Sequence, residues 1–301
     1  MTESPISLLD SGGDGAATVR NAVARCLDEV TRAGVTPGRS TETCGGSFAV
    51  IAGIGTTAAG ALRGALLHDA LAAAGVEPAD TMPFPDPAML LTDRSWDLAL
   101  VLSPWKQQVA EQLATRTDSA VRTGVVDTVV RGTGGPAGVN TNTWAAQAAM
   151  ETVLGGRTPD TVLVLGSGGS SNSVALGCRR AWPEARLIGS ARNAGALAAW
   201  AARFGADAVA PGELKALCAE QAPALIINTT TWGETDTSEK DPFVFDFAEL
   251  TRPGNCYFDL NNRVSALQTT ALRSGMNVMS GTFMQRVTNT CRAALLSASP
   301  R

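Results

Sequence analysis

The stretch TVLVLGSGGSSNSVALGCRRAW, residues 161–182, combines residue types and spacings that suit nucleotide binding. An apolar run leads into a glycine-rich turn, Gly166-Ser167-Gly168-Gly169-Ser170-Ser171. In such a strand–turn–helix unit, glycines permit a tight turn and close approach of a pyrophosphate, while amides at the helix N-terminus face the anion. The stretch predicts a dinucleotide site at these six residues, against the alternative of a ligand-free turn.

The end of the next expected strand distinguishes between the two nicotinamide cofactors. A site for NAD usually places Asp or Glu about 20 residues after the glycine turn, where it binds the ribose hydroxyls. No acidic residue lies between Glu184 and Asp207, and the strand ends in IGSARNAG. The Arg192 guanidinium can bind a 2′-phosphate, with neutral hydrogen bonds from Ser190 and Asn193. The sequence therefore predicts NADP(H).

Composition argues against several other kinds of chemistry. The chain has one histidine, His68, in an alanine-rich helical pattern, and six widely spaced cysteines without a CxxC pair. Metal sites need clustered ligands at characteristic spacings, so we expect no metal. Cysteines spaced in this way favour reduced thiols over a disulfide framework.

The whole-chain composition is that of a globular protein in the cytoplasm. The 301 residues are 45% hydrophobic and 17% charged, with a net charge of −4. This mild acidity argues against a nucleic-acid partner. No apolar run is long enough to span a membrane, and the N-terminus lacks the pattern of a secretory signal. We expect a small-molecule substrate as the main partner.

Alternating strands and helices must position these residues. In the first half, helices are expected at 16–35 and 58–75 and strands at 47–55 and 96–104, which indicates a parallel sheet. A second βαβ series has strands at 161–166, 185–190, 224–230, 255–260 and 277–281, with helices at 170–182, 194–204 and 212–221.

A helix at 143–156 would join the two halves, and a final helix at 282–297 would follow the last strand and pack back on the first domain. The predicted fold class is α/β with two domains. Residues 146–281 would form an NADP-binding Rossmann domain. Residues 1–145 and 282–301 would form an α/β substrate domain, completed by the C-terminal helix.

The sequence resembles the shikimate dehydrogenase family, with its quinate and aminoshikimate relatives, over about residues 47–297. The motifs that carry the resemblance are GVNTN (138–142), VLVLGSGGSS (162–171), SARN (190–193), INTTTWGE (227–234), YFDL (257–260) and SGTFM (280–284). The resemblance implies a catalytic domain, an NADP(H) domain and a cleft at their junction. It also implies that Arg192 reads the 2′-phosphate, that Thr229 and Gly281 lie near the nicotinamide, and that Met284 belongs to the cofactor site.

The family's catalytic lysine follows a Thr-x-Pro-(Phe/Tyr) segment, and LVLSPWKQQV makes Lys106 the matching residue. Hydride exchange between a carbinol and a carbonyl needs a proton donor or acceptor at the oxygen. A partly desolvated lysine beside a carboxylate can fill that role or stabilise an alkoxide. The alternative reading is a solvated loop lysine.

The catalytic aspartate of the family is replaced here. GxNTD ends in Asn142, and Asp127 stands where the family carries an asparagine. An amide cannot relay a proton at neutral pH, so Asn142 can only orient and hydrogen-bond. Our hypothesis is that Lys106 and Asp127 form the working pair, since Asp127 can hold the lysine charged or share its proton. The alternative is a structural aspartate that caps a turn.

The substrate contacts also depart from the family pattern. The Ser-x-Ser-Pro motif is absent from residues 54–66, although Thr56 and Thr57 offer hydroxyls there. Asn262 and Thr288 replace an expected tyrosine and glutamine. Because a site that loses hydrogen-bond partners discriminates strongly, shikimate is not the expected substrate. Substrate contacts are expected from Arg63, Asn140, Thr141, Asn262 and Thr288.

A small polar cyclic ketone or alcohol, or an imine, is the expected substrate class. Two alternatives stay open. One is an activity like that of methylenetetrahydrofolate dehydrogenase, and the other is a non-redox enzyme or an NADPH-binding sensor on the same fold. The N-terminal helical segment could cover a sheet edge or mediate formation of a homodimer.

Overall fold

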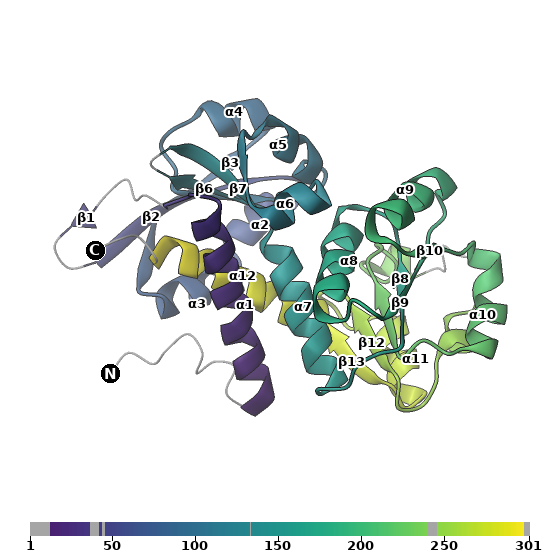
Figure 1. Ribbon diagram of the computed structural model, residues 1–301. Helices are drawn as coiled ribbons and strands as arrows, with labels where there is room; N and C mark the ends of the chain where they lie inside the picture. Colours follow the sequence, from purple (N-terminus) through teal and green to yellow (C-terminus); the bar gives the residue numbers. More distant parts are fainter. Residues whose placement is uncertain (1–12, 37–41, 44–45, 133, 240–245, 298–301) are drawn as a thin grey trace. The chain divides into compact units, whose positions relative to one another are not determined.

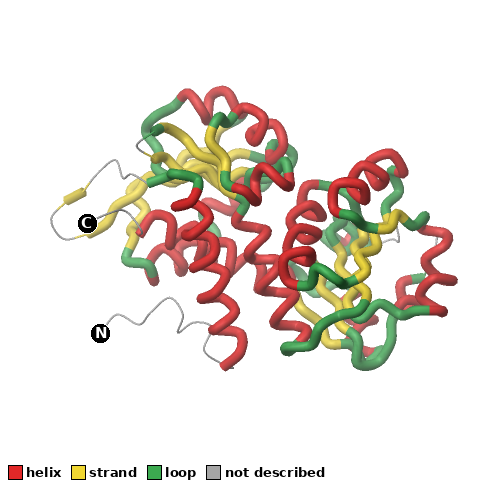
Figure 2. Tube along the Cα trace, in the orientation of Figure 1, coloured by secondary structure: helices red, strands yellow, loops and turns green. Residues whose placement is uncertain are grey.

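The computed structural model describes residues 13–36, 42–43, 46–132, 134–239 and 246–297. The chain divides into two compact units. Unit 1 is Met1–Ala145 with Gln285–Arg301, and unit 2 is Ala146–Met284. Each unit combines helices with a β-sheet (Figure 2), so the predicted α/β class is confirmed.

Unit 1 contains a sheet of seven strands among its described residues. They are β1 (Glu42–Thr43), β2 (Gly46–Ile54), β3 (Val76–Phe84), β4 (Leu98–Val101), β5 (Thr115–Arg116), β6 (Thr128–Gly132) and β7 (Gly135–Val139). The strand order is β1-β2-β4-β6-β7-β5, and β3 pairs with β2.

The sheet of unit 1 is mixed, so the expectation of a parallel sheet there is wrong. β2 pairs in parallel with β3 and β4, but β4 and β6 are antiparallel, and so are β6 and β7. β6 and β7 follow each other closely, and Gly135 adopts a φ of +111°. A reversal of this kind needs glycine because side chains rarely tolerate positive φ.

The helices of unit 1 include one break that the sequence pattern did not predict. The expected helix at 58–75 is two helices, because Gly64 is extended between them with φ −70° and ψ 134°. The helices are α1 (Gly13–Arg32), α2 (Ala58–Leu62), α3 (Ala65–Ala73), α4 (Pro87–Thr92), α5 (Lys106–Gln112), α6 (Asp118–Thr123), the start of α7 (Thr141–Leu154) and the end of α12 (Gly281–Ser297).

Helix α1 buries one face. Its buried residues recur at the spacing of a helical stripe, which is the pattern of a helix packed against a core. The buried apolar residues are Ala16, Val19, Ala22, Cys26 and Val30. Helix α1 is therefore an integral part of unit 1.

Unit 2 contains a six-stranded sheet in which every pair is parallel. Its strands are β8 (Thr161–Leu165), β9 (Arg186–Ser190), β10 (Asp207–Ala208), β11 (Leu225–Asn228), β12 (Cys256–Asp259) and β13 (Asn277–Ser280). The spatial order is β10-β9-β8-β11-β12-β13, which corresponds to 3-2-1-4-5-6 within the unit. This is the order of a Rossmann fold, so that prediction is confirmed.

Helices cover both faces of this sheet. They are α8 (Gly169–Ala181), α9 (Ala194–Phe204), α10 (Leu214–Glu220) and α11 (Ala266–Arg273). Within unit 2, α8 and α9 lie on one side of the sheet, and α10 and α11 lie on the other (Figure 1). The strand order reverses between β8 and β11, and ligands of such sheets bind at that reversal.

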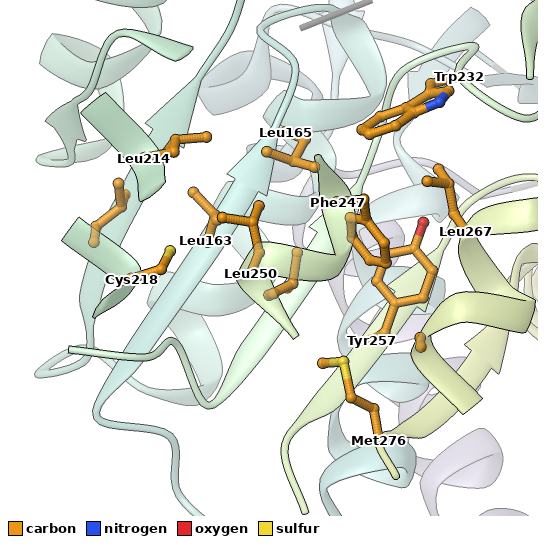
Figure 3. Close-up of a cluster of buried hydrophobic side chains, with 13 residues drawn as sticks. Leu163, Leu165, Leu214, Cys218, Trp232, Phe247, Leu250, Tyr257, Leu267 and Met276 are labelled. Atoms are coloured by element: carbon orange, nitrogen blue, oxygen red, sulfur yellow. The ribbon is translucent and has the colours of Figure 1, made fainter. Parts of the chain in front are cut away.

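The core of unit 2 joins the sheet to the α10 and α11 side. Figure 3 shows leucines of β8 packed beside Leu214 and Cys218 of α10, with Phe247 and Tyr257 next to them. The Phe247 and Tyr257 rings have centroids 4.9 Å apart. This packing fixes the carboxyl ends of β8, β11 and β12, where the polar residues of the unit gather.

Candidate functional site

The turn after β8 requires glycine at its first position. Gly166 has a φ of +113°, and its amide donates to the Ser190 carbonyl at 2.8 Å. A Cβ atom there would lie 2.5 Å from Oγ1 of Thr229. Gly166 thus brings the chain between the ends of β9 and β11, at the reversal of strand order.

The N-terminus of α8 has no side chain in the described chain that caps its first-turn amides. Gly168 precedes the helix and provides no side-chain cap, and a Cβ atom at this position would meet nothing within 4 Å. Ser171 is fully buried, and its hydroxyl donates to the Gly168 carbonyl at 2.6 Å. First-turn amides have no partner within their own helix, so an anion can accept their hydrogen bonds. Ser167, Gly169 and Ser170 are partly exposed.

The residues expected to read the adenosine ribose lie together at the end of β9. Arg192 is exposed and forms no ion pair with the described part of the chain. Asn193 caps α9, with its Oδ1 accepting from the Ala196 amide at 2.9 Å. Ser190 is buried, and its hydroxyl has no hydrogen-bond partner among the described residues.

The residues assigned to the nicotinamide side follow β11 and β13. The Thr229 hydroxyl donates to the Leu165 carbonyl at 2.8 Å, beside the glycine turn. The Gly281 amide donates to the Asn261 carbonyl at 3.1 Å. A side chain at Gly281 would overlap the carbonyl group of Leu260. Met284 is buried.

A buried aspartate that the sequence analysis did not single out organises the end of β12. Asp259 Oδ1 accepts from the Asn261 amide at 3.1 Å and from Asn228 Nδ2 at 3.2 Å, and Oδ2 accepts from Ser265 at 3.0 Å. Burial raises the pKa of Asp259, while the hydrogen bonds from the Asn261 amide and from Ser265 oppose the shift. Asn262, the expected substrate contact nearby, is exposed.

Lys106 of unit 1 is half-buried at the first position of α5. Its Nζ forms no hydrogen bond or ion pair with any residue that the structure describes, and its carbonyl accepts from the Val126 amide at 3.0 Å. Desolvation lowers the pKa of Lys106, the nearby Asp127 carboxylate opposes this, and the Arg292 guanidinium adds to it. The partial positive charge of a helix N-terminus also disfavours an ammonium group.

Asp127 is buried and accepts four hydrogen bonds. Oδ1 accepts from the Thr128 hydroxyl at 2.8 Å and from the Thr141 hydroxyl and amide at 2.7 and 3.1 Å. Oδ2 accepts from the Asn142 amide at 2.6 Å. Donors alone surround these oxygens, which is the pattern of a carboxylate. Asp127 acts on Lys106 through its charge, which raises the lysine pKa. Within the described residues, no hydrogen bond joins the two side chains.

Two residues that depart from the family pattern contact each other. The Thr288 hydroxyl of α12 donates to Asn142 Oδ1 of α7 at 3.1 Å. Asn142 is half-exposed, and its Nδ2 has no partner among the described residues. The two positions that differ from the family motifs are therefore in direct contact.

The other expected substrate residues of unit 1 have different settings. Asn140 is buried, donates to the Thr123 hydroxyl at 2.8 Å and accepts from the Thr143 amide at 3.1 Å, which caps α7. Thr141 is buried against Asp127. Arg63 is exposed at the end of α2 and forms no hydrogen bond with these residues, so its role stays a prediction.

Sequence reasoning missed Arg292. This buried arginine donates from Nη2 to the Asp127 carbonyl, from Nε to the Thr128 hydroxyl and from Nη1 to Asn289 Oδ1, each at 3.0 Å. The signal was a lone basic residue within the apolar run CRAALL. We refer to the following residues as the Asp127 cluster: Lys106, Asp127, Thr128, Thr141, Asn142, Thr288 and Arg292.

A buried glutamate connects α1 to the elements around the Asp127 cluster. Glu29 accepts from the Ser119 amide and hydroxyl at 2.6 and 2.7 Å and from the Trp144 indole at 2.9 Å. Ser119 lies in the first turn of α6, where amides favour a negative charge. Trp144 follows Asn142 in α7, so Glu29 holds the helix that carries the cluster.

Neither a metal centre nor a membrane span is found within the described ranges. No group of three His, Cys, Asp or Glu side chains there could hold a metal ion. None of the described helices has the length and apolar character to cross a bilayer. Cys44 lies outside the described residues, and the remaining cysteines are free and buried: Cys26, Cys178, Cys218, Cys256 and Cys291.

The chain is similar in structure to several dehydrogenases. Shikimate 5-dehydrogenase of Thermus thermophilus, solved with NADP(H) and shikimate, has a TM-score of 0.66 and 24% identity, over 82% of this chain and 98% of that one. Quinate dehydrogenase of Corynebacterium glutamicum, solved with NAD, has a TM-score of 0.68 and 21% identity, over 82% and 94%.

A third structure, shikimate 5-dehydrogenase of Listeria monocytogenes with shikimate and NAD, has a TM-score of 0.65 and 17% identity, over 85% and 93%. No protein-family model matches the sequence. Curated proteins likewise give no match. The chain therefore has the fold of the shikimate and quinate dehydrogenases, at low sequence identity.

Proposed function

We propose that this chain is an NADP(H)-dependent oxidoreductase of the shikimate dehydrogenase type. It would act on a small polar cyclic ketone or alcohol, or on an imine, rather than on shikimate. The observation that carries the proposal is Lys106, half-buried beside Asp127 with no partner for its ammonium group in the described chain. A desolvated, unpaired lysine is costly to maintain unless the group has a task.

The residues at the reversal of strand order in unit 2 fit a dinucleotide. Gly166 permits the tight turn against Thr229, Gly168 faces open space that a pyrophosphate could occupy, and the amides of α8 are not capped by a side chain. Arg192 supports NADP(H) over NAD(H), because it is exposed, unpaired within the described chain and not accompanied by the usual acid. When bound, the nicotinamide supplies or accepts the hydride.

Lys106 would exchange a proton with the substrate oxygen or nitrogen. During reduction the carbonyl carbon gains a hydride, and the oxygen takes the ammonium proton of Lys106, which leaves a neutral amine. During oxidation the amine accepts the proton of the hydroxyl. Such proton transfer contributes about 10²–10⁴-fold to the rate. Asp127 favours the ammonium form electrostatically.

A substrate other than shikimate is supported by the polar groups of unit 1. Asn142 stands in place of the family's aspartate and can donate from its amide. Thr288 is bound to Asn142, and Arg63 is exposed away from any partner among the described residues. Several binding groups differ from the family pattern at once. A changed substrate explains these differences better than a loss of substrate binding does.

The first experiment measures NADPH consumption with a panel of cyclic ketones and imines. We expect turnover by the wild type and a loss of about 10²–10⁴-fold in Lys106→Met, with unchanged NADPH affinity. Lys215→Met, which changes an exposed lysine, is the matched control. NADPH binding without turnover of any compound would favour the sensor or non-redox alternative.

The second experiment separates cofactor binding from folding. Gly168→Ala places a methyl group in open space, so it should leave thermal stability unchanged and weaken NADPH binding at the pyrophosphate. Gly166→Ala is the contrasting variant, because positive φ and the Thr229 hydroxyl both oppose a side chain there. It should destabilise the protein. Full NADPH affinity in Gly168→Ala would contradict the predicted site.

A further inference from the structure

The Asp127 cluster offers hydrogen-bond donors to a ligand and keeps its strong acceptor inside. Its partly exposed polar side chains are Lys106 and Asn142, and neither Nζ of Lys106 nor Nδ2 of Asn142 has a partner among the described residues. Asp127 is buried, with four donors on its oxygens. Thr288 is also buried.

Thr288 determines which end of the Asn142 amide faces outward. Its hydroxyl donates to Asn142 Oδ1, so the carbonyl end of this amide is already occupied. The Nδ2 end carries two donors and no acceptor. The backbone of Asn142 is held as well, since its amide donates to Asp127 at 2.6 Å. Asp127 holds the backbone of Asn142, and Thr288 occupies its Oδ1, so Nδ2 is the end of the side chain that stays available to a ligand.

We propose that the substrate presents an acceptor-only oxygen to Lys106 and Asn142, as a ketone does, and that Thr288 sets this preference. The inference rests on the proposed function and names the substrate class of that same site. An alcohol oxygen can accept the same hydrogen bonds, but while Lys106 is an ammonium group the alcohol's own hydrogen would find no acceptor in the cluster. A polar hydrogen left unpaired in a binding site weakens binding.

The test compares equilibrium binding of matched ligand pairs to the full chain without nucleotide. The pairs are 4-hydroxycyclohexanone with cyclohexane-1,4-diol, and 4-oxocyclohexanecarboxylate with 4-hydroxycyclohexanecarboxylate. Ligand-observed NMR gives both dissociation constants of each pair. We expect each ketone to bind about tenfold more tightly than its alcohol, since one unpaired donor costs about that factor.

Variants of the two residues assign the preference. Asn142→Asp converts a donor into an acceptor and should reverse the preference towards the alcohol. Thr288→Val removes the hydroxyl at nearly constant volume, frees the amide to turn and should reduce the ketone preference to about twofold or less. Thr290→Val is the matched control on α12, because the Thr290 hydroxyl donates only to the Arg286 carbonyl of the same helix.

The outcomes separate this inference from the proposed function. Equal binding within each pair, or a ketone preference that survives both Asn142→Asp and Thr288→Val, overturns the inference. Ketone binding that follows the predicted pattern, without NADPH consumption, supports the inference and rejects the proposed reaction. Turnover without any ketone preference keeps the reaction and rejects the inference.

Discussion

Lys106 lies under the influence of two opposite charges. Asp127 raises its pKa and Arg292 lowers it, and both effects act on a group whose pKa burial has already lowered. Arg292 contacts the Asp127 carbonyl and, through Thr128, its carboxylate. The arginine therefore acts on the lysine as a positioning and electrostatic group, without contacting it.

Replacement of Arg292 by Met should raise the pKa of Lys106. The sequence has three lysines, Lys106, Lys215 and Lys240, so NMR of the ¹³C-dimethylated protein resolves each titration. Lys215 is the internal reference, because its bond to Glu249 raises its pKa independently of the Asp127 cluster. Reduction needs the ammonium form, so the rate falls as pH rises through the pKa of Lys106. The variant should move that fall to higher pH.

Arg131→Met is the control for this measurement. Arg131 is a partly buried arginine of the same unit, and it donates to the carbonyls of Trp96 and Asp93. Its loss should destabilise unit 1 and leave the titration of Lys106 in place. A Lys106 titration that is identical in the wild type and in Arg292→Met would refute the electrostatic role of Arg292.

Among the elements, α1 contributes a buried carboxylate to the framework of the cluster. Glu29 accepts hydrogen bonds from the first turn of α6 and from the Trp144 indole of α7. Helix α1 therefore stabilises the start of α7, which carries Thr141 and Asn142. Its function in this structure is to support unit 1.

Glu29→Gln should destabilise the protein by about 1–3 kcal/mol, because an amide nitrogen would face donor groups in the interior. Urea unfolding followed by tryptophan fluorescence measures the change, and Trp144 reports on the site itself. Asp28→Asn, next to it on α1, breaks only an exposed ion pair with Arg32 and should cost less than about 0.5 kcal/mol. Equal midpoints for the two variants would contradict a structural role for Glu29.

Five of the six strands of unit 2 could be predicted from local pattern, whereas the two-residue β10 and several elements of unit 1 could not. In unit 2, apolar runs such as TVLVL are buried on both faces, and glycine or polar residues mark their ends. In unit 1, β6 and β7 contain glycine, proline and arginine. The direction of β6 depends on its pairing with β4, and that of β7 on its pairing with β6. Local sequence does not determine whether a strand runs parallel or antiparallel to its neighbour.

The candidate site divides in the same way. The glycine turn is a local motif, and the structure has a positive φ at Gly166 and open space beside Gly168, while the binding of a dinucleotide there stays a prediction. Arg292 and Asp127 are 165 residues apart, so no spacing rule could pair them. The contact between Asn142 and Thr288 spans 146 residues and could be found only from the fold.

At the scale of the whole molecule, binding of the proposed cofactor should stabilise unit 2 most directly. NADPH at about 100 times its dissociation constant should stabilise the folded chain by about 2.7 kcal/mol. Hydrogen exchange should show the new protection at residues 166–171 and 190–193. NADH should give a weaker effect, and Arg192→Ala should remove the difference between the two nucleotides. Equal protection by both nucleotides in the wild type would contradict the assignment of Arg192.

The division of the chain determines which unit is completed last during translation. Unit 2 is one continuous segment, whereas unit 1 is interrupted by it and resumes at Gln285. Thr288 and Arg292 therefore leave the ribosome after all of unit 2, although they complete a cluster whose aspartate was made much earlier. Until they arrive, Asp127 lacks its arginine neighbour. A nascent chain can thus order the earlier strands of unit 2, such as β8 and β11, before Thr288 and Arg292 are available to Asp127.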